Sequence, residues 1–267
     1  MREIDIDELR QIQLSILQYV HDFCEKNSIK YYLYYGSLLG AVRHDGYIPW
    51  DDDIDIAMCR DDYDRFINTF NRENNGYFAH ALYADDSFCL QFCKIAKLNT
   101  SIKEDTDYGS KNIGINIDLF PLDSLPSSIN PLYEKLFYYL SSVLYAKLLP
   151  LRFVHGSFKQ IFATVLYKAL FFFISPRQIA LMHQKIAAHW NLVDGSDCIA
   201  DCLVGAHGVF PIFNSELFKP VLHKFEGREF YIPCGYDSIL RGYYGDYSVL
   251  PAPEFRVFKH GFTAWVE

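Results

Sequence analysis

Acidic side chains are closely spaced at a point where the sequence pattern indicates a strand. Asp53 and Asp55 alternate with Ile54 and Ile56. Successive side chains of a strand point to opposite faces and the chain rises about 3.3 Å per residue, so these carboxylates project together, about 6.6 Å apart. Two carboxylates in this arrangement can share Mg²⁺, which prefers oxygen ligands. The pattern predicts metal-dependent phosphate chemistry.

Two further acids extend this candidate site. Asp51 has the same parity as Asp53 and Asp55 but lies at the entrance of the strand, so it ranks behind them. Asp118 lies between Ile117 and Leu119 in a short apolar run that is typical of a buried strand. A buried carboxylate requires a partner, and we predict a metal ion as that partner.

A candidate phosphate-binding segment precedes the acids. The β-favouring run 31–35 is followed by Gly36 and Ser37 and then by the helix-compatible segment LLGAVRH. We expect a strand, a tight turn and a helix start, whose unpaired N–H groups suit phosphate oxygens. Arg43 and His44 could add positive charge at the rim.

Helices and strands alternate around these residues. Apolar residues at helical spacing predict an N-terminal helix that ends near Asn27 and packs on a sheet, and a second helix over about 61–70 with Asp61 as its N-cap. Strands are expected near residues 77–84, 89–98 and 114–119. This alternation predicts an α/β or α+β fold around a mixed sheet.

The region 131–175 is strongly apolar and rich in aromatic residues. Its two apolar stretches are each about 15 residues long, whereas a membrane-spanning helix needs about 20 apolar residues. We therefore favour a helical subdomain packed on the catalytic core. A pair of helices lying in a membrane interface is the alternative.

Composition narrows the class of protein. The chain has 267 residues and a net charge of -8, which argues against a nucleic-acid partner because such a partner normally needs a basic face. The seven cysteines and the charged N-terminal residues predict a cytoplasmic protein. Cys89 with Cys93, and Cys198 with Cys202, could bind zinc, but small buried hydrophobic residues are the favoured interpretation.

The order of these motifs resembles that of the nucleotidyltransferase superfamily. More narrowly, GSLLGAVRHDGYIPWDDDIDIAM resembles the LicD family of phosphotransferases, whose eukaryotic relatives include the fukutins. The resemblance continues through LQFCKIAKLNT, IDLFPLDSLP and FEGREFYIPCGYDSILRGYYGDYSVLP, whereas about 129–200 is not distinctive.

The resemblance implies a reaction. The family transfers phosphocholine or an alditol phosphate from a CDP-linked donor, such as CDP-choline, to a hydroxyl of a surface polysaccharide, lipopolysaccharide or teichoic acid, and CMP leaves. The alternative is a nucleotidyltransferase that moves a nucleoside monophosphate to a small molecule and releases pyrophosphate. A third hypothesis, binding without turnover, predicts that Asp53→Asn leaves binding intact.

The resemblance also implies roles for individual residues. Asp53, Asp55 and Asp118 would bind one or two Mg²⁺ ions, with Mn²⁺ as a substitute, and Asp51 or Asp118 would act as the base. Tyr244, beside Tyr243, could contact a choline ammonium through cation–π interaction. Glu226 matches the family but could simply pair with Arg228 or Lys224. The residues expected to bind the donor's phosphates are Gly36, Ser37, Lys94, Arg43, His44 and Arg241.

The predicted organisation has three parts. Residues 1–128 would form the nucleotidyltransferase-like core, a mixed sheet with flanking helices. Residues 129–200 would be a helical insertion, and 201–267 would complete the substrate site. A lipid-linked acceptor would make peripheral contact with the inner face of the cell membrane useful.

Overall fold

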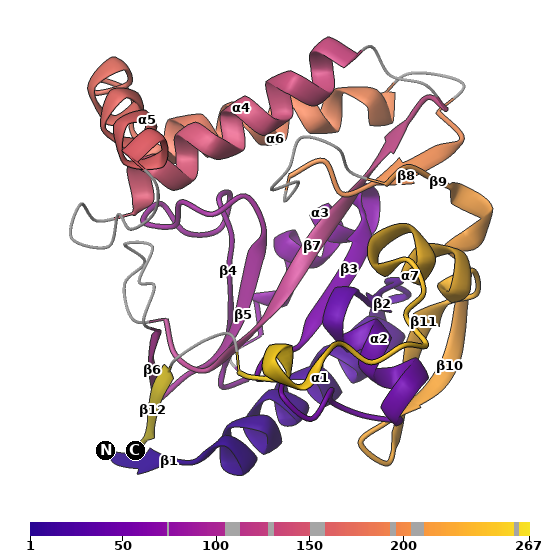
Figure 1. Ribbon diagram of the computed structural model, residues 1–267. Coiled ribbons are helices and arrows are strands. Elements are labelled where there is room, and N and C mark those ends of the chain that lie inside the picture. The colour runs from indigo at the N-terminus through magenta and orange to yellow at the C-terminus, as the bar shows by residue number, and fades with distance from the viewer. Residues whose placement is uncertain are drawn as a thin grey trace.

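The structure is a computed structural model that describes residues 1–73, 75–104, 113–127, 131–149, 158–192, 196–203, 211–258 and 262–267. Its centre is a mixed sheet in the spatial order β2, β3, β7, β5 and β4 (Figure 1). β3 and β7 are parallel, and the other neighbours are antiparallel. The α+β architecture predicted from the sequence is confirmed. The bounds of the five strands are Tyr32–Leu33, Asp55–Cys59, Asn116–Leu125, Cys93–Lys97 and Tyr77–His80.

β7 is the long diagonal strand of Figure 1, and it joins two parts of the molecule. Its first half pairs with β3 and β5, and its second half pairs with β8 (Cys198–Ala200), which pairs in turn with β9 (Phe213–Asn214). The segment after residue 197 therefore returns to the same sheet.

Helices cover this sheet. α1 (Ile6–Asn27) packs against β5 and β7, and it ends at the predicted residue. Phe23 of α1 contacts Phe66 and Phe70 of α3 (Arg60–Phe70), so the two helices share one apolar core. α2 (Tyr35–His44) packs against β3, α7 (Tyr236–Tyr244) and the hairpin of β10 (Pro220–Phe225) and β11 (Arg228–Pro233).

A small antiparallel sheet joins the two ends of the chain. β12 (Phe262–Val266) lies between β1 (Arg2–Ile4) and β6 (Thr100–Glu104). The N- and C-termini consequently lie together in Figure 1. Two short 3₁₀ helices, η3 (Ser215–Leu217) and η4 (Pro253–Phe255), complete the C-terminal part.

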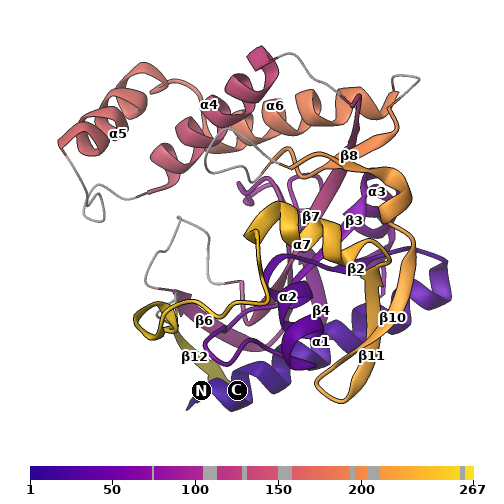
Figure 2. The ribbon, with the colours of Figure 1, turned by 45° about the vertical axis from the view of Figure 1, so that its right-hand side comes forward.

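The helices of region 131–192 form a layer across one end of β7 (Figures 1 and 2). They are α4 (Pro131–Leu148), α5 (Phe158–Leu170), α6 (Pro176–Ala188) and the 3₁₀ helix η2 (His189–Leu192). Ser175 caps α6 through a capping box, and Pro176 occupies the first turn, where its missing N–H costs nothing. In the described part of the chain, every helix is too short or too polar to cross a membrane.

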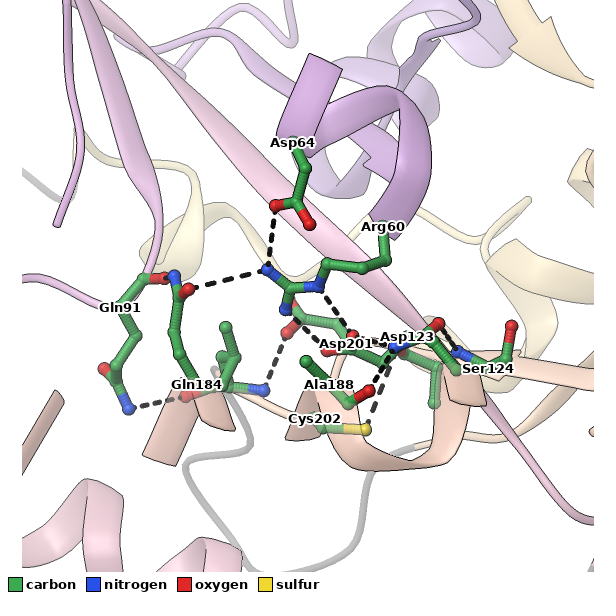
Figure 3. Close-up of polar contacts among 12 residues, drawn as sticks. Arg60, Asp64, Gln91, Asp123, Ser124, Gln184, Ala188, Asp201 and Cys202 are labelled. Atoms are coloured by element: carbon green, nitrogen blue, oxygen red, sulfur yellow. Dashed lines mark hydrogen bonds and ion pairs between the residues drawn. The ribbon is translucent and has the colours of Figure 1, made fainter. Parts of the chain in front are cut away.

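A buried ion pair between α3 and β7 is the point at which side chains of this helical layer bond to the sheet (Figure 3). Arg60 donates to both carboxylate oxygens of Asp123 on β7, at 2.8 and 2.9 Å, and both side chains are buried. Asn191 of η2 donates to the same carboxylate at 2.7 Å. Gln184 of α6 accepts a longer bond from Arg60 at 3.5 Å. The layer is therefore held by charge-assisted hydrogen bonds as well as by apolar packing.

Several sequence-based boundaries were wrong. The strands expected at 77–84 and 89–98 are shorter, because residues 81–92 form turns, and the strand expected at 114–119 continues to Leu125. Asp61 does not cap α3: the N-cap is Cys59, which makes no side-chain capping bond. Asp61 lies instead in the first turn, where its charge still suits the helix dipole.

Candidate functional site

The acidic residues gather where β3 begins beside the middle of the sheet. Asp55 on β3 lies directly opposite Asp118 on β7, and Asp118 lies directly opposite Lys94 on β5. Lys94 Nζ donates to Asp118 Oδ1 at 2.8 Å and to Asn116 Oδ1 at 3.1 Å. Three adjacent strands thus place two carboxylates and one ammonium side by side.

The loop before β3 adds three more carboxylates. β3 begins at Asp55, so Asp53 lies in this loop and not on the strand as predicted. Asp51, Asp52 and Asp53 each offer an oxygen atom, and these atoms all lie within 4.8 Å of one another. α1 fixes the loop, because Arg10 Nε donates to the Asp51 carbonyl at 3.2 Å and Gln13 Nε2 to the Asp52 carbonyl at 2.9 Å.

The electrostatic state of Asp55 reflects this crowding. Burial raises the pKa of its carboxyl well above the usual range, and the charges of Asp53, Asp118 and Asp51 raise it further, whereas Lys94 opposes the shift. Like charges held this close favour a bound cation or a proton. The donor set consists of carboxylate oxygens, which fit Mg²⁺ or Mn²⁺.

The N-terminus of α2 faces the acids. The predicted tight turn at Gly36 and Ser37 is the first turn of α2, which begins at Tyr35. A Cβ on Gly36 would lie 2.7 Å from Asp51 Oδ2 and 3.8 Å from Asp55 Oδ2, so the helix backbone approaches both carboxylates closely. Ser37 Oγ accepts a bond from the Asp55 backbone N–H at 2.8 Å. The helix start and the acidic loop are therefore built as one unit.

Tyr35 has an unusual backbone conformation at the point where the chain passes from β2 into α2. Its φ is 40°, in the left-handed region, which costs a non-glycine residue about 1–3 kcal/mol. Its ring packs against Tyr34, Phe120 and Tyr243, and its hydroxyl donates to Asp201 at 2.7 Å. These contacts hold the unusual backbone in place.

The predicted phosphate-binding residues separate into two groups. Lys94 is only 12% exposed and bonded to Asp118, so it is not an exposed strand lysine. Arg43 Nε donates to His44 Nε2 at 3.0 Å, and another Arg43 nitrogen donates to the Tyr247 carbonyl. Arg241 lies apart from them, bonded to Asp237 on the exposed surface of α7.

Tyr244 interacts electrostatically with the acids and with Arg43, which lies near a second basic residue, Arg256, that was not predicted from the sequence. The pKa of Tyr244 is raised by burial and then by the charges of Asp55 and Asp51. The pKa of Arg43 is lowered by burial, and the charges of Tyr244 and Arg256 act on it in opposite directions, Tyr244 raising it and Arg256 lowering it. Arg256 also lies over the Trp50 ring, 5.8 Å from its centroid. Arg43 and Arg256 therefore form a basic rim next to the carboxylates.

Other predicted contacts differ from the structure. Tyr243 forms part of an aromatic wall, with its hydroxyl 2.7 Å from that of Tyr34. Glu226 pairs with neither Arg228 nor Lys224: its carboxylate accepts from the Tyr47 backbone N–H at 3.0 Å and fixes the turn before the acidic loop. Asn116, Asp201 and Arg256 were missed because strand pairing and chain return, which single-sequence patterns do not reveal, bring them here.

The cysteines show no metal-binding arrangement among the described residues, where the acids at 51–53 are the one cluster with suitable spacing. Cys93 and Cys202 are buried, and burial raises the pKa of both thiols well above the usual range. The interpretation of these two residues as small buried hydrophobic side chains agrees with this.

Comparison with known proteins agrees with the phosphate chemistry that the acidic site indicates. The family model described as "LicD/FKTN/FKRP, nucleotidyltransferase domain" matches residues 28–133, which include α2, the acidic loop, β3, β5 and all of β7. The lipopolysaccharide cholinephosphotransferase LicD of Haemophilus influenzae is 30% identical over 267 residues, the full length of both chains. The human ribitol 5-phosphate transferase FKRP is 44% identical over 45 residues, which are 17% of this chain and 9% of that protein. The acidic site, the family model and the full-length match agree, and the chain belongs to the LicD family of transferases.

Proposed function

We propose that this protein is a metal-dependent phosphotransferase that moves phosphocholine from CDP-choline to a hydroxyl of a surface polysaccharide, lipopolysaccharide or teichoic acid. An alditol phosphate is the other candidate cargo, because human FKRP is named a ribitol 5-phosphate transferase; its donor would be a CDP-alditol. The observation that carries the proposal is the convergence of Asp55, Asp118 and the acids at 51–53 on the N-terminus of α2. We place the reaction in the cytoplasm, at the inner face of the membrane.

The metal would be held by Asp53, Asp55 and Asp118. Their oxygen ligands fit one or two Mg²⁺ ions, with Mn²⁺ as a substitute, and burial, followed by the charges of the neighbouring aspartates, raises the pKa of Asp55. When bound, the metal would neutralise the charge of the donor's phosphates. The N–H groups of α2 at Gly36 and Ser37 would receive phosphate oxygens, because four N–H groups at a helix start lack intrahelical partners.

The remaining residues would position the two substrates. Arg43, with His44 beside it, and Arg256 would contact the donor's phosphates at the basic rim. Lys94 would act mainly through Asp118, whose orientation it fixes. Tyr244 lies next to the carboxylates and is partly exposed, so it would contact the transferred head group. Arg241 has the weakest support, because it is bonded to Asp237.

The chemical step would be an in-line displacement. The acceptor's hydroxyl oxygen attacks the phosphorus that carries the head group, the bond from that phosphorus to the bridging oxygen breaks, and CMP leaves with the electron pair. Asp51 would take the hydroxyl proton. Asp118 is less suited to this role, because its oxygen already accepts a bond from the Lys94 ammonium.

The test is CMP release by the purified protein with Mg²⁺, a crude glycan acceptor and, in separate reactions, CDP-choline, CDP-ribitol or CDP-glycerol. We expect CMP from one donor, together with transfer of its head group to the glycan. Asp55→Asn should lose at least about 100-fold in rate, because the metal site loses a charged ligand. Asp61→Asn, an exposed acid in the first turn of α3, is the matched control and should keep its activity.

Two results would contradict the proposal. Pyrophosphate release from a nucleoside triphosphate, with no CMP from any donor, would indicate a nucleotidyltransferase. Full activity of Asp55→Asn would show that the acidic cluster is not the reaction centre.

A further inference from the structure

α5 presents an apolar face to solvent, the reverse of an ordinary surface helix. Its inner side packs on α4, where Tyr167 contacts Tyr139 with ring centroids 5.6 Å apart. Its outer side carries exposed apolar residues at i, i+1, i+4 and i+5 spacing, which places them on one face. These residues and the segment after them form what we call the α5 face: Ile161, Phe162, Val165, Leu166, Leu170, Phe172 and Phe173.

The α5 face is strongly exposed. Phe162 is 59% exposed, Leu170 65%, Phe172 72% and Phe173 94%. Isolated exposed apolar residues are ordinary on soluble proteins, but a contiguous patch of this kind marks an interaction surface. A surface helix normally directs polar side chains outward.

α5 is held firmly in this orientation. Lys147 of α4 donates to the Phe171 carbonyl at 2.7 Å, and Lys168 of α5 donates to the Lys147 carbonyl at 3.1 Å. The two lysines therefore bind the C-terminal end of α5 to that of α4. The apolar side is kept outward by these bonds and by the aromatic contacts on the inner side.

The charge of this region identifies the kind of surface that it fits. Residues 131–192 contain seven Lys or Arg and one acidic residue, whereas the rest of the chain contains 18 basic and 32 acidic residues. Lys135 on α4 and Lys185 on α6 are exposed. A basic helical layer with an outward apolar, phenylalanine-rich face matches helices that lie in the interface of an anionic bilayer.

We propose that the α5 face is a membrane-docking surface that inserts into the headgroup region of an anionic bilayer, with the exposed Lys135 and Lys185 of the helical layer adding attraction to the lipid headgroups. Docking would hold the enzyme beside a lipid-linked substrate. It does not depend on the proposed reaction, because lipid binding can be measured without donor or acceptor.

The test is co-sedimentation of the full chain with vesicles of phosphatidylcholine alone or with about 30% phosphatidylglycerol. We expect binding to the anionic vesicles that weakens as salt is raised, because the headgroup attraction is screened. The double variant Phe162→Ser/Phe173→Ser should bind at least about tenfold more weakly, because it removes two inserting rings. Leu222→Ser, which changes a 51% exposed leucine on β10, should bind as the unchanged chain does.

Circular dichroism on heating shows that each variant is folded. The proposal is overturned if the unchanged chain does not co-sediment with anionic vesicles, or if the double variant binds them as well as the unchanged chain does. Sedimentation velocity supplies the other decisive outcome: a dimer of the unchanged chain that the double variant abolishes would assign the α5 face to a second copy of the protein.

Discussion

At the scale of single residues, the acidic site depends on how closely the backbone of α2 approaches the carboxylates. Gly36 has no Cβ, and a Cβ built there would lie 2.7 Å from Asp51 Oδ2. Contacts below 3.0 Å require something to move, and the atom that would move is the end of the Asp51 side chain. The position of the proposed base is therefore coupled to the absence of a side chain at residue 36.

We predict that Gly36→Ala lowers kcat/KM by about 10- to 100-fold, because a displacement near 1 Å at a reacting group has effects of this size. Its thermal stability should be unchanged or slightly higher, because alanine favours a helix more than glycine does. Rates of CMP release and thermal unfolding of the same preparation check both parts.

Gly40→Ala in the same helix is the informative comparison. Its Cβ would lie 2.4 Å from the Gly46 carbonyl oxygen, a backbone atom, so this variant should lose stability. If Gly36→Ala kept full activity, the close approach would not matter for the reaction.

The residue scale also shows what sequence reasoning can reach. The types and order of Asp53, Asp55 and Asp118 were enough to predict a carboxylate site, because each lies in a local pattern. The contact between Lys94 and Asp118 depends on β5 pairing with β7 in one register, and that pairing is not local. The start of α2 at Tyr35 is likewise not predictable from local sequence. Tyr35 has a left-handed backbone conformation, and a residue far away in the sequence, Tyr243, helps to stabilise it.

At the scale of elements, β7 and the helical layer meet in a buried polar network. His183 of α6 lies within it, in contact with the Phe137 ring. Its Nε2 donates to the Cys202 carbonyl at 3.2 Å, and its Nδ1 accepts from Gln91 Nε2 at 2.7 Å. Protonation of Nδ1 would set two donors against each other, so this environment accepts only the neutral ring.

This arrangement predicts a pH effect on stability. Burial lowers the pKa of His183 from 6.5 to about 4. The unfolded chain therefore binds more protons between these values, and the free energy of unfolding falls as the pH drops from about 6.5 to 4. The loss from this residue is about 3 kcal/mol once the pH is below 4.

His183→Gln should show a smaller loss of stability over this pH range, although it is less stable than the unchanged chain at pH 7. Urea unfolding at a series of pH values measures the slope. His223→Gln, on the β10 strand, is the control and should keep the original slope. An unchanged slope in His183→Gln would mean that this ring does not limit stability in acid.

Elements also divide into those that local patterns predict and those that they do not. α1 was predicted closely because its apolar residues repeat at helical spacing over many turns. The sheet of β1, β12 and β6 was not predicted, since it pairs strands from the two ends of the chain with one from the middle. Its register depends on the closed fold and leaves no local signal.

At the scale of the whole molecule, charge is unevenly distributed. The net charge is -8, yet region 131–192 has a surplus of basic residues, so most of the negative charge belongs to the catalytic part. Five aspartates of that part, at positions 51, 52, 53, 55 and 118, gather where β3 and β7 meet. An anionic donor approaching this site would be repelled unless a cation were bound.

The whole-molecule charge predicts that donor binding requires a divalent metal. By titration calorimetry, we expect the affinity for CDP-choline, or for whichever CDP-linked donor is active, to fall at least about 100-fold in EDTA and to recover when Mg²⁺ or Mn²⁺ is added. The reason is that the clustered carboxylates oppose a diphosphate at short range strongly. Cytidine, which has no phosphate, should bind equally with and without metal. Equal donor affinity in EDTA would contradict this and would assign the donor's phosphates to the basic rim of Arg43 and Arg256 alone. A metal requirement shared by cytidine would instead indicate that the metal organises the acidic loop, because only an effect on the protein itself could reach an uncharged ligand.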